Sequence, residues 1–437
     1  MRQSNFNIWH KKLQTELKIE NNKFWLNGES CDGDVAHVSF LVPKNLAKPF
    51  LPYRFNDQVY YSNCYSCLKI KHTGPCTHKT DGKRRFSSVY TIVELQFALS
   101  LGYQVYVYEL WHYSQTGRVL NEFVSVLASY RLKNSGDSFR DLSEDQLAKT
   151  CKAINSKMNF SKSELSLSPS SIKCNKAAKQ FFKDMLNSLY GRFALNTGFS
   201  KRIFVRSQHE LDEILSNRNV TVLEFFPVAD DTIEIEFLPN SSCGPNRDSN
   251  LLFTSIINAK GRIMMYQIIQ KLEQQGCEPI YVDTDGIVFA TPKGFNNFPF
   301  EIGLAFGQFK PVLGDSAVIK KFYSLGPRNY CLLYEDNNSL HYVTKIKGLS
   351  AGCDNLQNYI TPATYETFIN EHFENQVKTV YLPQMRLKIE PARKSFEHVM
   401  VSQEFSNELH IKRFILKDQK KHVTYPYGYS FKNVDWK

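Results

Sequence analysis

The chain has 437 residues, of which 42% are hydrophobic and 22% are charged. This composition excludes disordered and collagen-like classes, and the length is enough for two or three hydrophobic cores. Lys and Arg number 54 against 43 Asp and Glu, so a formal net charge of +11 should attract a polyanion such as nucleic acid. The sequence has neither a membrane-spanning apolar run nor an apolar core near its start, so we expect a soluble intracellular protein.

The first part of the chain alternates strand signals with one helix. Short β-rich runs at 35–42 and 59–61 are followed by a Leu/Phe pattern with helical spacing at 91–102 and by a strand pattern at 104–113. These elements predict a mixed α+β layer. Residues 132–171 are rich in Ser, Lys, Asp and Asn, and we expect a polar linker there with one short helix.

The chain beyond residue 171 contains two long predicted helices and a hairpin. The helices cover 174–196 and 256–275, and the sequence EPIYVDTDGIVFAT then predicts a strand, a tight turn and a strand. Beyond Phe309 further strands and a helix near 365–375 indicate a smaller basic domain, which ends close to the string YPYGY.

Two aspartates occupy the turn of this hairpin. Asp283 and Asp285 stand two residues apart between apolar strands, so the turn would present carboxylates at its tip. Mg²⁺ is held by one or two carboxylates plus substrate phosphates, which is what phosphoryl transfer needs. The alternative is an ordinary β-turn in which Asp and Gly satisfy turn geometry.

Polar side chains recur along the helix predicted at 174–196. Lys176, Lys179, Lys183, Asn187 and Tyr190 follow one another at three- and four-residue spacing, so a helix would line them along one side. Such a row could grip a triphosphate and test a nascent base pair. The alternative is a basic, solvated helix face.

Three of the ten cysteines cluster with histidines. Cys64, Cys67, Cys76 and His78 form the pattern C-x2-C-x8-C-x-H, which offers four ligands for a tetrahedral structural Zn²⁺ site. His72 is a bystander or an alternative ligand. The competing interpretation is a set of free thiols without a metal, since a reducing compartment disfavours disulfides.

Two of these motifs carry a family resemblance. The string KDMLNSLYG resembles the Lys-x3-Asn-Ser-x-Tyr-Gly motif of family B DNA polymerases, and YVDTDG resembles their downstream Tyr-x-Asp-Thr-Asp-Ser motif. The order of LPYRF, Cys-x2-Cys, CTH, ELQFALSLGY and YELWHY is similar to the protein-primed polymerases of Polinton or Maverick elements and related viruses and linear plasmids. The resemblance runs from about Gly33 to YPYGY and implies an α+β polymerase palm with a fingers helix and a thumb.

The resemblance implies roles for the motif residues. Asp285 would bind both catalytic Mg²⁺ ions, and Asp283 would be an ancillary ligand or orient the site. Lys183 would contact the phosphates of the incoming deoxynucleoside triphosphate, Asn187 would lie near its sugar and base, and Tyr190 would pack by the nascent pair.

Further contacts are expected with nucleotide and DNA. Lys179 belongs to the same row and is a second nucleotide-binding candidate. Gly191 is the last residue of the motif, and we expect it to contact the DNA. In the thumb, KIKG resembles the lysine motif that holds the primer end, which makes Lys345 and Lys347 candidates; the preceding GPRNY is also family-like. The implied partners are template and primer DNA, deoxynucleotides and a priming terminal protein.

The chain also departs from the family. A polymerase palm needs a second carboxylate strand, usually Asp-x2-Ser-Leu-Tyr-Pro, and the sequence has none; Asp32 and Asp34 are the nearest substitutes but lack the Leu-Tyr-Pro signature. In the family this motif would lie just where the chain begins, so we expect Met1 to be an internal start. The upstream exonuclease carboxylates are absent too, and Gly286 replaces the usual Ser.

The predicted organisation follows from these motifs. We expect an unmatched segment at 1–32, a palm part with a terminal-protein-region-like insertion and the Cys/His cluster at 33–131, a polar linker at 132–171, a fingers helix at 172–200, a palm with the aspartate hairpin at 201–310, and a thumb with the C-terminal region at 311–437.

Three functions remain open at this stage. The first is a DNA-directed DNA polymerase, and the second is a catalytically inactive nucleic-acid-binding remnant or one half of a split polymerase, which the missing carboxylate favours. The third is a zinc-dependent DNA-binding regulator, a function that would leave both polymerase motifs unexplained. The nuclear, viral-factory and mitochondrial compartments are not distinguished.

Overall fold

The computed structural model describes residues 6–8, 17–113, 117–140, 142–160, 163–194, 200–229, 231–239, 249–295, 297–314, 316–347, 360–373, 379–390, 395–408, 412–417 and 422–430. The chain divides into two compact units, each assembled from segments that are distant in sequence. Unit 1 comprises Met1–Gly191, Leu251–Lys310 and Ile411–Lys437, and unit 2 comprises Arg192–Asn250 and Pro311–His410.

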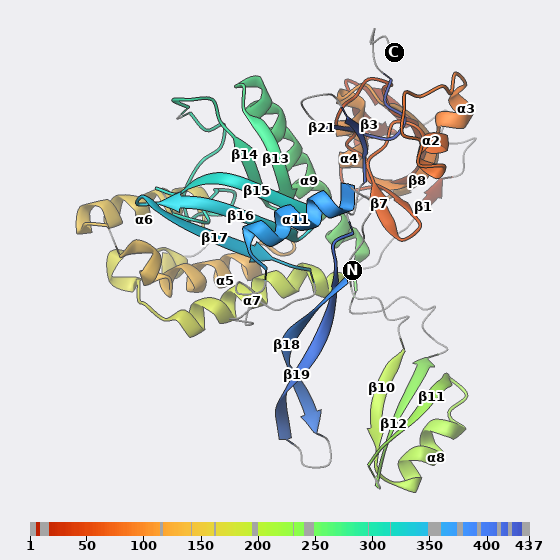
Figure 1. Ribbon diagram of the computed structural model, residues 1–437, viewed down its shortest axis with the longest axis vertical. Helices are drawn as coiled ribbons and strands as arrows, with labels where there is room; N and C mark the ends of the chain where they lie inside the picture. Colours follow the sequence, from red (N-terminus) through yellow and green to blue (C-terminus); the bar gives the residue numbers. More distant parts are fainter. Residues whose placement is uncertain are drawn as a thin grey trace. The chain divides into compact units, whose positions relative to one another are not determined.

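Unit 1 combines short antiparallel sheets with helices (Figure 1). Its strands are β1 (Phe6–Ile8), β2 (Leu17–Glu20), β3 (Lys23–Leu26), β4 (Glu29–Ser30), β5 (Val35–Leu41), β6 (Tyr53–Phe55), β7 (Gln58–Tyr60), β8 (Phe86–Thr91), β9 (Gln104–His112), β13 (Glu278–Asp283), β14 (Gly286–Ala290), β20 (Phe414–Lys417) and β21 (His422–Tyr425). Its helices are α2 (Tyr65–Lys69), α3 (Asp81–Arg84), α4 (Ile92–Ser100), α5 (Asn121–Lys133), η1 (Gly136–Phe139), α6 (Glu144–Met158), η2 (Ser163–Leu165), η3 (Pro169–Ser171), most of α7 (Lys176–Phe193) and α9 (Leu251–Gln274).

A four-stranded antiparallel sheet in the order β1-β9-β5-β8 forms the centre of unit 1. Alternate residues of β5, namely Ala36, Val38 and Phe40, are at most 1% exposed, as the two-residue period of a strand requires. Phe40 stacks on Phe86 of the neighbouring strand at 5.2 Å and meets Tyr90 edge-on at 5.5 Å. The alternation and these cross-strand rings fix which face of the sheet carries the core.

Helix α9 packs against α4, although the two helices are more than 150 residues apart in sequence. The rings of Phe50, Phe97 and Tyr266 contact one another with centroid distances of 4.7–5.6 Å. Beside them, Arg262 on α9 donates to the buried carboxylate of Glu94 on α4 at 2.5 Å. α9 also runs along β13 (Figure 1). The packing of α9 on α4 therefore fixes the position of the hairpin β13–β14 within unit 1.

A buried carboxylate joins the ends of β5 and β9. Asp34 is 1% exposed; its Oδ2 lies 2.7 Å from Nδ1 of His112, and its Oδ1 accepts the Tyr113 N–H at 2.9 Å. Burial raises the pKa of Asp34, and the hydrogen bonds from His112 and Tyr113 oppose that shift only in part. Burial would lower the pKa of His112, but the hydrogen bonds and charges of Asp34 and Glu29 outweigh burial and raise it.

The segment 132–171 is folded and is not the polar linker that its composition predicts. A capping box of Ser143 and Gln146 starts α6, the expected short helix, which continues to Met158. Apolar residues from this segment then form a core cluster: Leu132, Phe139, Cys151, Ile154 and Leu167, together with Ala305. Because these few apolar residues are spaced by helical turns and 3₁₀ turns, they meet on one side despite the polar composition.

Unit 2 has two antiparallel sheets and a long hairpin. Its elements are β10 (Lys201–Val205), α8 (Gln208–Ser216), β11 (Val220–Ala229), β12 (Thr232–Pro239), β15 (Val318–Gly326), β16 (Asn329–Asp336), β17 (Ser339–Lys345), α11 (Pro362–Phe373), β18 (Thr379–Glu390) and β19 (Ser395–Ser406). The sheets have the orders β10-β12-β11 and β15-β16-β17, and α11 packs on β15 and β16. A core around Leu325, Cys331 and Tyr365 closes the second sheet.

The unit boundaries differ from the predicted domains in three places. The predicted fingers segment 172–200 is divided, because the chain passes from unit 1 to unit 2 between Gly191 and Arg192. The predicted palm segment 201–310 is divided, because residues up to Asn250 belong to unit 2 and those from Leu251 to Lys310 belong to unit 1. The predicted thumb 311–437 also ends early, since the chain returns to unit 1 at Ile411. The physical reason is burial, because α9 and the segment after Ile411 both carry apolar side chains that pack in the core of unit 1.

None of the helices in the described ranges is both long and apolar enough to cross a lipid bilayer.

The buried pair of Asp34 and His112 should dominate the stability of the central sheet. We expect His112→Ala to lower the free energy of unfolding by about 3 kcal/mol or more, because it leaves a buried carboxylate without its charged partner. The measurement is urea unfolding followed by tryptophan fluorescence, which reports on unit 1 through Trp25 on β3 and Trp111 on β9, the tryptophans of the described ranges.

The matched control is His37→Ala on the same sheet. His37 hydrogen-bonds the hydroxyl of Ser87 at 3.1 Å and its ring lies 5.3 Å from that of Tyr108, so it has no buried charged partner among the described contacts and its loss should cost less than about 1 kcal/mol. Equal losses for the two variants would contradict the role given to the buried pair.

Candidate active site and metal centre

The two aspartates predicted as catalytic lie at the tip of the hairpin β13–β14. The register pairs Asp283 with Gly286, so Thr284 and Asp285 form a two-residue loop. Asp283 is half-buried and accepts a hydrogen bond from the Thr284 hydroxyl at 3.1 Å, whereas Asp285 is exposed. The turn therefore presents both carboxylates at one end of the hairpin.

The loop carries backbone strain at a residue that should avoid it. Thr284 has φ of 59°, in the left-handed region that glycine, asparagine and aspartate tolerate and a β-branched residue does not. Such a conformation costs on the order of 1–3 kcal/mol and tends to occur at functional sites. A glycine at this position would have been the unstrained choice for a hairpin turn.

One face of the hairpin is anchored in the core of unit 1. Ile287 and Phe289 of β14 pack against a buried cluster on α9 that contains Met265, Ile268 and Leu272. This contact holds the base of the hairpin rigidly while the aspartate tip stays accessible.

On β13, Ile280 and Val282 remain 50% and 40% exposed. Within the described part of the chain, β13 and β14 form a sheet of only two strands, so both of its outer edges lack a neighbouring strand.

No third ligand joins the aspartate pair among the described residues. The described groups of at least three clustered His, Cys, Asp or Glu side chains are the Cys/His cluster and a second group of Cys31, Asp34 and His112. The hairpin thus offers two carboxylates, a number that fits a Mg²⁺ ion shared with substrate phosphates.

The nearest sequence candidates for a further carboxylate are engaged elsewhere. Both carboxylate oxygens of Asp34 already accept hydrogen bonds inside the protein, and Asp32 accepts a bond from Gln96 Nε2 at 2.8 Å. The group of Cys31, Asp34 and His112 is therefore satisfied without an ion, and burial raises the pKa of the Cys31 thiol to about 12, which keeps it protonated.

Helix α7 carries the predicted nucleotide-binding row. Lys183, Asn187 and Tyr190 are exposed, and their spacing places them along one side of the helix. An adjacent side of the helix is partly buried, with Phe182 stacked on Tyr130 at 5.4 Å. Packing on one side thus leaves an ammonium, an amide and a phenol facing outward.

Two further residues of this helix differ in their surroundings. Lys179 donates to both carboxylate oxygens of Asp137, at 2.9 and 2.7 Å, and to Ser138. Its charge therefore has an anionic partner within the protein, and this hydrogen bond lowers the pKa of Asp137. Gly191 is exposed with open space around it, so a backbone or a phosphate could approach there.

The two thumb motifs meet across one pair of strands in unit 2. Strand pairing sets Tyr330 of GPRNY opposite Lys345 of KIKG, and the Lys345 ammonium lies 6.0 Å from the ring centroid of Tyr330. The buried Asn329 side chain accepts the Lys347 N–H at 2.7 Å. Both lysines are exposed. GPRNY therefore contacts both lysine positions of KIKG, through the Tyr330 ring and the Asn329 side chain.

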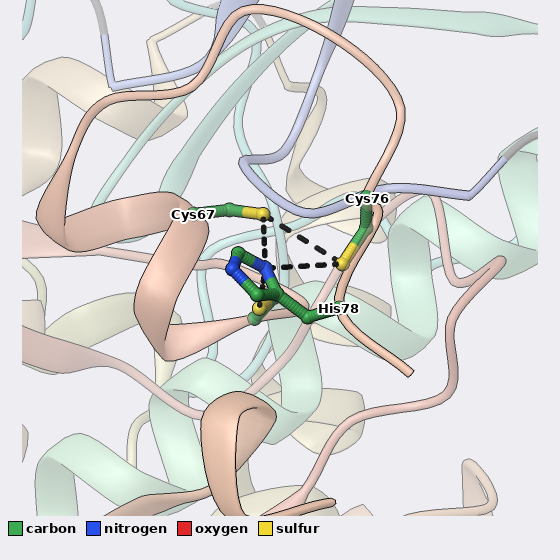
Figure 2. Close-up of side chains that lie close together, drawn as sticks. Cys67, Cys76 and His78 are labelled. Carbon is green, nitrogen blue, oxygen red and sulfur yellow. Dashed lines mark hydrogen bonds between the residues drawn. The ribbon is translucent and has the colours of Figure 1, made fainter. Parts of the chain in front are cut away.

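The Cys/His pattern folds into one compact cluster (Figure 2). Cys64 is the N-cap residue of α2, Cys67 lies within that helix, and Cys76 and His78 follow on the next loop. His78 Nδ1 lies 3.5, 3.3 and 3.8 Å from the sulfur atoms of Cys64, Cys67 and Cys76, and all four ligand atoms lie within 4.8 Å of one another. His72 is outside the cluster, because its Nε2 bonds the Pro75 carbonyl at 3.2 Å.

The thiols of this cluster influence one another. Hydrogen bonds with Cys64 and Cys76 raise the pKa of Cys67, whereas hydrogen bonds with Cys64 and Cys67 lower the pKa of Cys76. Cys64 and Cys67 are fully buried, and the Cys67 and Cys76 sulfur atoms lie 3.6 Å apart, well beyond the length of a disulfide bond. The cluster is a set of convergent free thiols and one imidazole.

Sequence reasoning missed the residues that close over this cluster. The C-terminal strap, Tyr425–Ser430, lies against Cys64 and Cys76 although it is more than 340 residues away in sequence. Gly428 is the clearest member, with φ of +83° and no room for a side chain. The string YPYGY offered a turn signal, but nothing in it indicates a contact with the cysteines.

Comparisons with known proteins agree with the coarser part of the predicted function, a relationship to DNA polymerases. The chain is similar to a protein described as a probable DNA polymerase from Neurospora intermedia, with 28% identity over 172 residues. The aligned part covers 39% of this chain and 16% of that relative, so the chain spans only a small part of the relative's length. No family model matches, and no solved structure matches. The similarity supports a relationship to DNA polymerases.

Proposed function

We propose that this chain carries catalytic elements of a DNA-directed DNA polymerase of the protein-primed family B type. The observation that supports this most directly is the strained hairpin turn, in which Thr284 holds Asp283 and Asp285 at one tip. Strain of this kind persists when function requires it, and an ordinary hairpin would use glycine or asparagine here. The partial similarity to a DNA polymerase agrees with this proposal.

In this proposal the structural elements take the parts of a polymerase. The hairpin β13–β14 with α9 belongs to a palm, α7 is the fingers helix, and β15–β17 with α11 belong to a thumb. The exposed row on α7 supports the second assignment, since Lys183 offers a phosphate ligand and Tyr190 a flat surface for a base pair. The exposed Lys345 and Lys347 support the third, because phosphate contacts hold a primer without reading its sequence.

The reaction would join a deoxynucleotide to a primer. The primer hydroxyl attacks the α-phosphate in line and pyrophosphate leaves, while the template selects the base by pairing. Lys183 would neutralise charge on the triphosphate, and Asn187 and Tyr190 would orient the sugar and base. Mg²⁺, held by Asp283 and Asp285 together with substrate phosphates, would supply electrostatic stabilisation of the developing charge. The priming terminal protein is the partner that the motif order implies.

A second candidate function has an observation of its own. Among the described residues only two carboxylates gather at the hairpin tip, whereas stabilising both the attacking and the leaving oxygen needs two metal ions and further ligands. The chain would then be a DNA-binding remnant or one half of a split polymerase whose missing carboxylate comes from elsewhere. The excess of basic residues would serve binding in either case.

Removing the exposed aspartate should abolish synthesis. We expect Asp285→Asn to reduce Mg²⁺-dependent extension of a primed template by about a thousandfold or more, because the neutral amide loses the charge that holds the metal ion. The assay is single-nucleotide incorporation by the full chain, with binding to the same primed DNA measured in parallel.

Asp57→Asn is the matched control, since Asp57 also lies in a hairpin turn and is exposed. The Asp57→Asn variant should incorporate the nucleotide at the rate of the unmodified chain. Extension that survives Asp285→Asn would refute the proposed active site. Salt-sensitive DNA binding by the unmodified chain without incorporation under any divalent metal would instead establish the second candidate function.

Two lysines of α7 should behave differently when they are removed. Lys183→Ala should raise KM for the incoming deoxynucleotide by about tenfold or more, since a charge-assisted contact to phosphate is lost. Lys179→Ala should change KM by less than about twofold, because its ammonium group already binds Asp137.

Steady-state incorporation on one primed template measures both variants. DNA affinity should be the same for both, so that the KM change reports on the nucleotide alone. If Lys179→Ala raised KM and Lys183→Ala did not, the assignment of the phosphate contact would be reversed.

A further inference from the structure

The Cys/His cluster has the dimensions of a tetrahedral metal centre. A Zn²⁺ ion with Zn–S bonds of about 2.3 Å and a Zn–N bond of about 2.0 Å requires ligand atoms roughly 3.5–3.8 Å apart. The described separations are 3.6 Å between the Cys67 and Cys76 sulfur atoms and 3.3–3.8 Å between each sulfur and His78 Nδ1. Four convergent protein ligands leave no open position, which is typical of a structural rather than a catalytic site.

The loop that carries these ligands has few other means of holding its shape. Between α2 and α3 the chain runs from Ile70 to Thr80 without a helix or strand. Ile70 is 67% exposed, and no residue of this stretch is buried. A segment that buries so little apolar surface needs another source of stability, and ligand bonds supply it in many loop-rich metal sites.

The C-terminal strap completes the walls of the cluster. Tyr427 O accepts the N–H of Asn63, the residue before Cys64, at 2.8 Å, and Tyr429 O accepts the N–H of Cys76 at 3.1 Å. The strap thus hydrogen-bonds to the backbone on both cysteine-bearing segments.

The strap is also held closely by packing. The side chain of Tyr427 is 5% exposed and lies beside Tyr60, with ring centroids 6.2 Å apart. A Cβ at Gly428 would lie 2.3 Å from the Cβ of Cys64, closer than any real contact, so the strap backbone can lie this close to Cys64 only with a glycine at position 428. Ser430 N–H donates to the Lys44 carbonyl at 2.8 Å and ends the contact.

We propose that Cys64, Cys67, Cys76 and His78 bind one Zn²⁺ ion, and that this ion holds the surface to which the C-terminal strap is bound. The metal fixes Cys64 and Cys76, and the strap bonds to Cys76 itself and to the residue preceding Cys64. Metal binding and strap binding therefore stabilise each other, because either one orders the backbone that the other requires.

This coupling affects how the two units are connected. The chain leaves unit 1 after Lys310, forms the larger part of unit 2, and returns to unit 1 at Ile411. The strap lies on the returning segment, so the zinc ion adds to the contacts that secure the second of these two chain connections, among them the buried Phe414 in the core of unit 1. Loss of the metal would weaken that connection.

The first test is metal content. Full-length chain from zinc-supplemented medium should contain about one zinc ion per molecule by mass spectrometry, and Cys64→Ser should lose it. His78→Cys should retain it, because a fourth thiolate preserves a tetrahedral site. Cys174→Ser and His72→Ala are matched controls outside the cluster and should keep full metal content.

A readout on the unmodified chain covers the case in which Cys64→Ser fails to fold. Cobalt(II) added to the metal-free protein should give the intense visible absorption of a tetrahedral thiolate site. Absence of zinc, together with absence of this cobalt spectrum, would overturn the metal site.

The second test concerns the strap. Gly428→Ala should speed the release of zinc to a chromogenic chelator by about 10–100-fold, the usual effect of disturbing groups that support metal ligands. Gly28→Ala is the control, since Gly28 has nearly the same φ, +87°, but open space around it. This pair of variants separates the clash with Cys64 from the general cost of a left-handed backbone.

Hydrogen exchange shows whether the metal holds the strap. Zinc removal should accelerate exchange in peptides that contain Asn63, Cys76 and residues 425–430, while β5 and β9 keep their protection. Equal protection of the strap with and without zinc, or equal zinc release from the two glycine variants, would overturn the coupling and leave only the metal site.

Discussion

The contact between α4 and α9 is the interaction on which the arrangement of unit 1 depends. Three rings, from Phe50, Phe97 and Tyr266, pack together, and beside them Arg262 binds the buried Glu94 carboxylate. A buried carboxylate without such a partner would be costly, so the ion pair and the ring cluster act together in selecting one packing of the two helices. Because β13 follows α9 directly, the aspartate turn acquires a fixed position within unit 1 from a contact made far from it.

Chemistry-bearing residues lie where this scaffold leaves the backbone exposed or strained. Asp283 and Asp285 occupy a turn with a left-handed threonine, whereas Asp34, with similar chemistry, is buried and fully bonded within the central sheet. The same residue type therefore occurs in two environments, and the difference is accessibility. The buried Asp34 carboxylate accepts hydrogen bonds from His112 and Tyr113 and stabilises the fold, whereas the exposed Asp285 carboxylate can accept a ligand from solvent.

The two units have separate hydrophobic cores. Unit 1 is built from three segments of sequence, so it is held together by contacts among the four-stranded sheet, α9 and the C-terminal strap. Unit 2 carries the exposed Lys345 and Lys347 on a strand pair with its own core. In the proposed polymerase, the lysines that would contact DNA and the aspartates that would hold a metal ion are therefore supported by separate cores. The proposed zinc site lies near the C-terminal strap and not at the aspartate hairpin.

The sequence by itself determined the local elements and the candidate ligands. Periodicity predicted α4, α7, α9 and the aspartate hairpin, because helical and strand spacing depend on neighbouring residues alone, and the C-x2-C-x8-C-x-H pattern identified four side chains that do converge. Only the tertiary structure decided that 132–171 is packed, that the predicted palm segment divides at Leu251, that Lys179 is paired with Asp137, and that the C-terminal strap lies against the cysteines. The last two features depend on contacts between residues about 40 to more than 340 positions apart, and the packing of 132–171 depends on burial of a few apolar side chains within a polar segment, so local pattern does not select them.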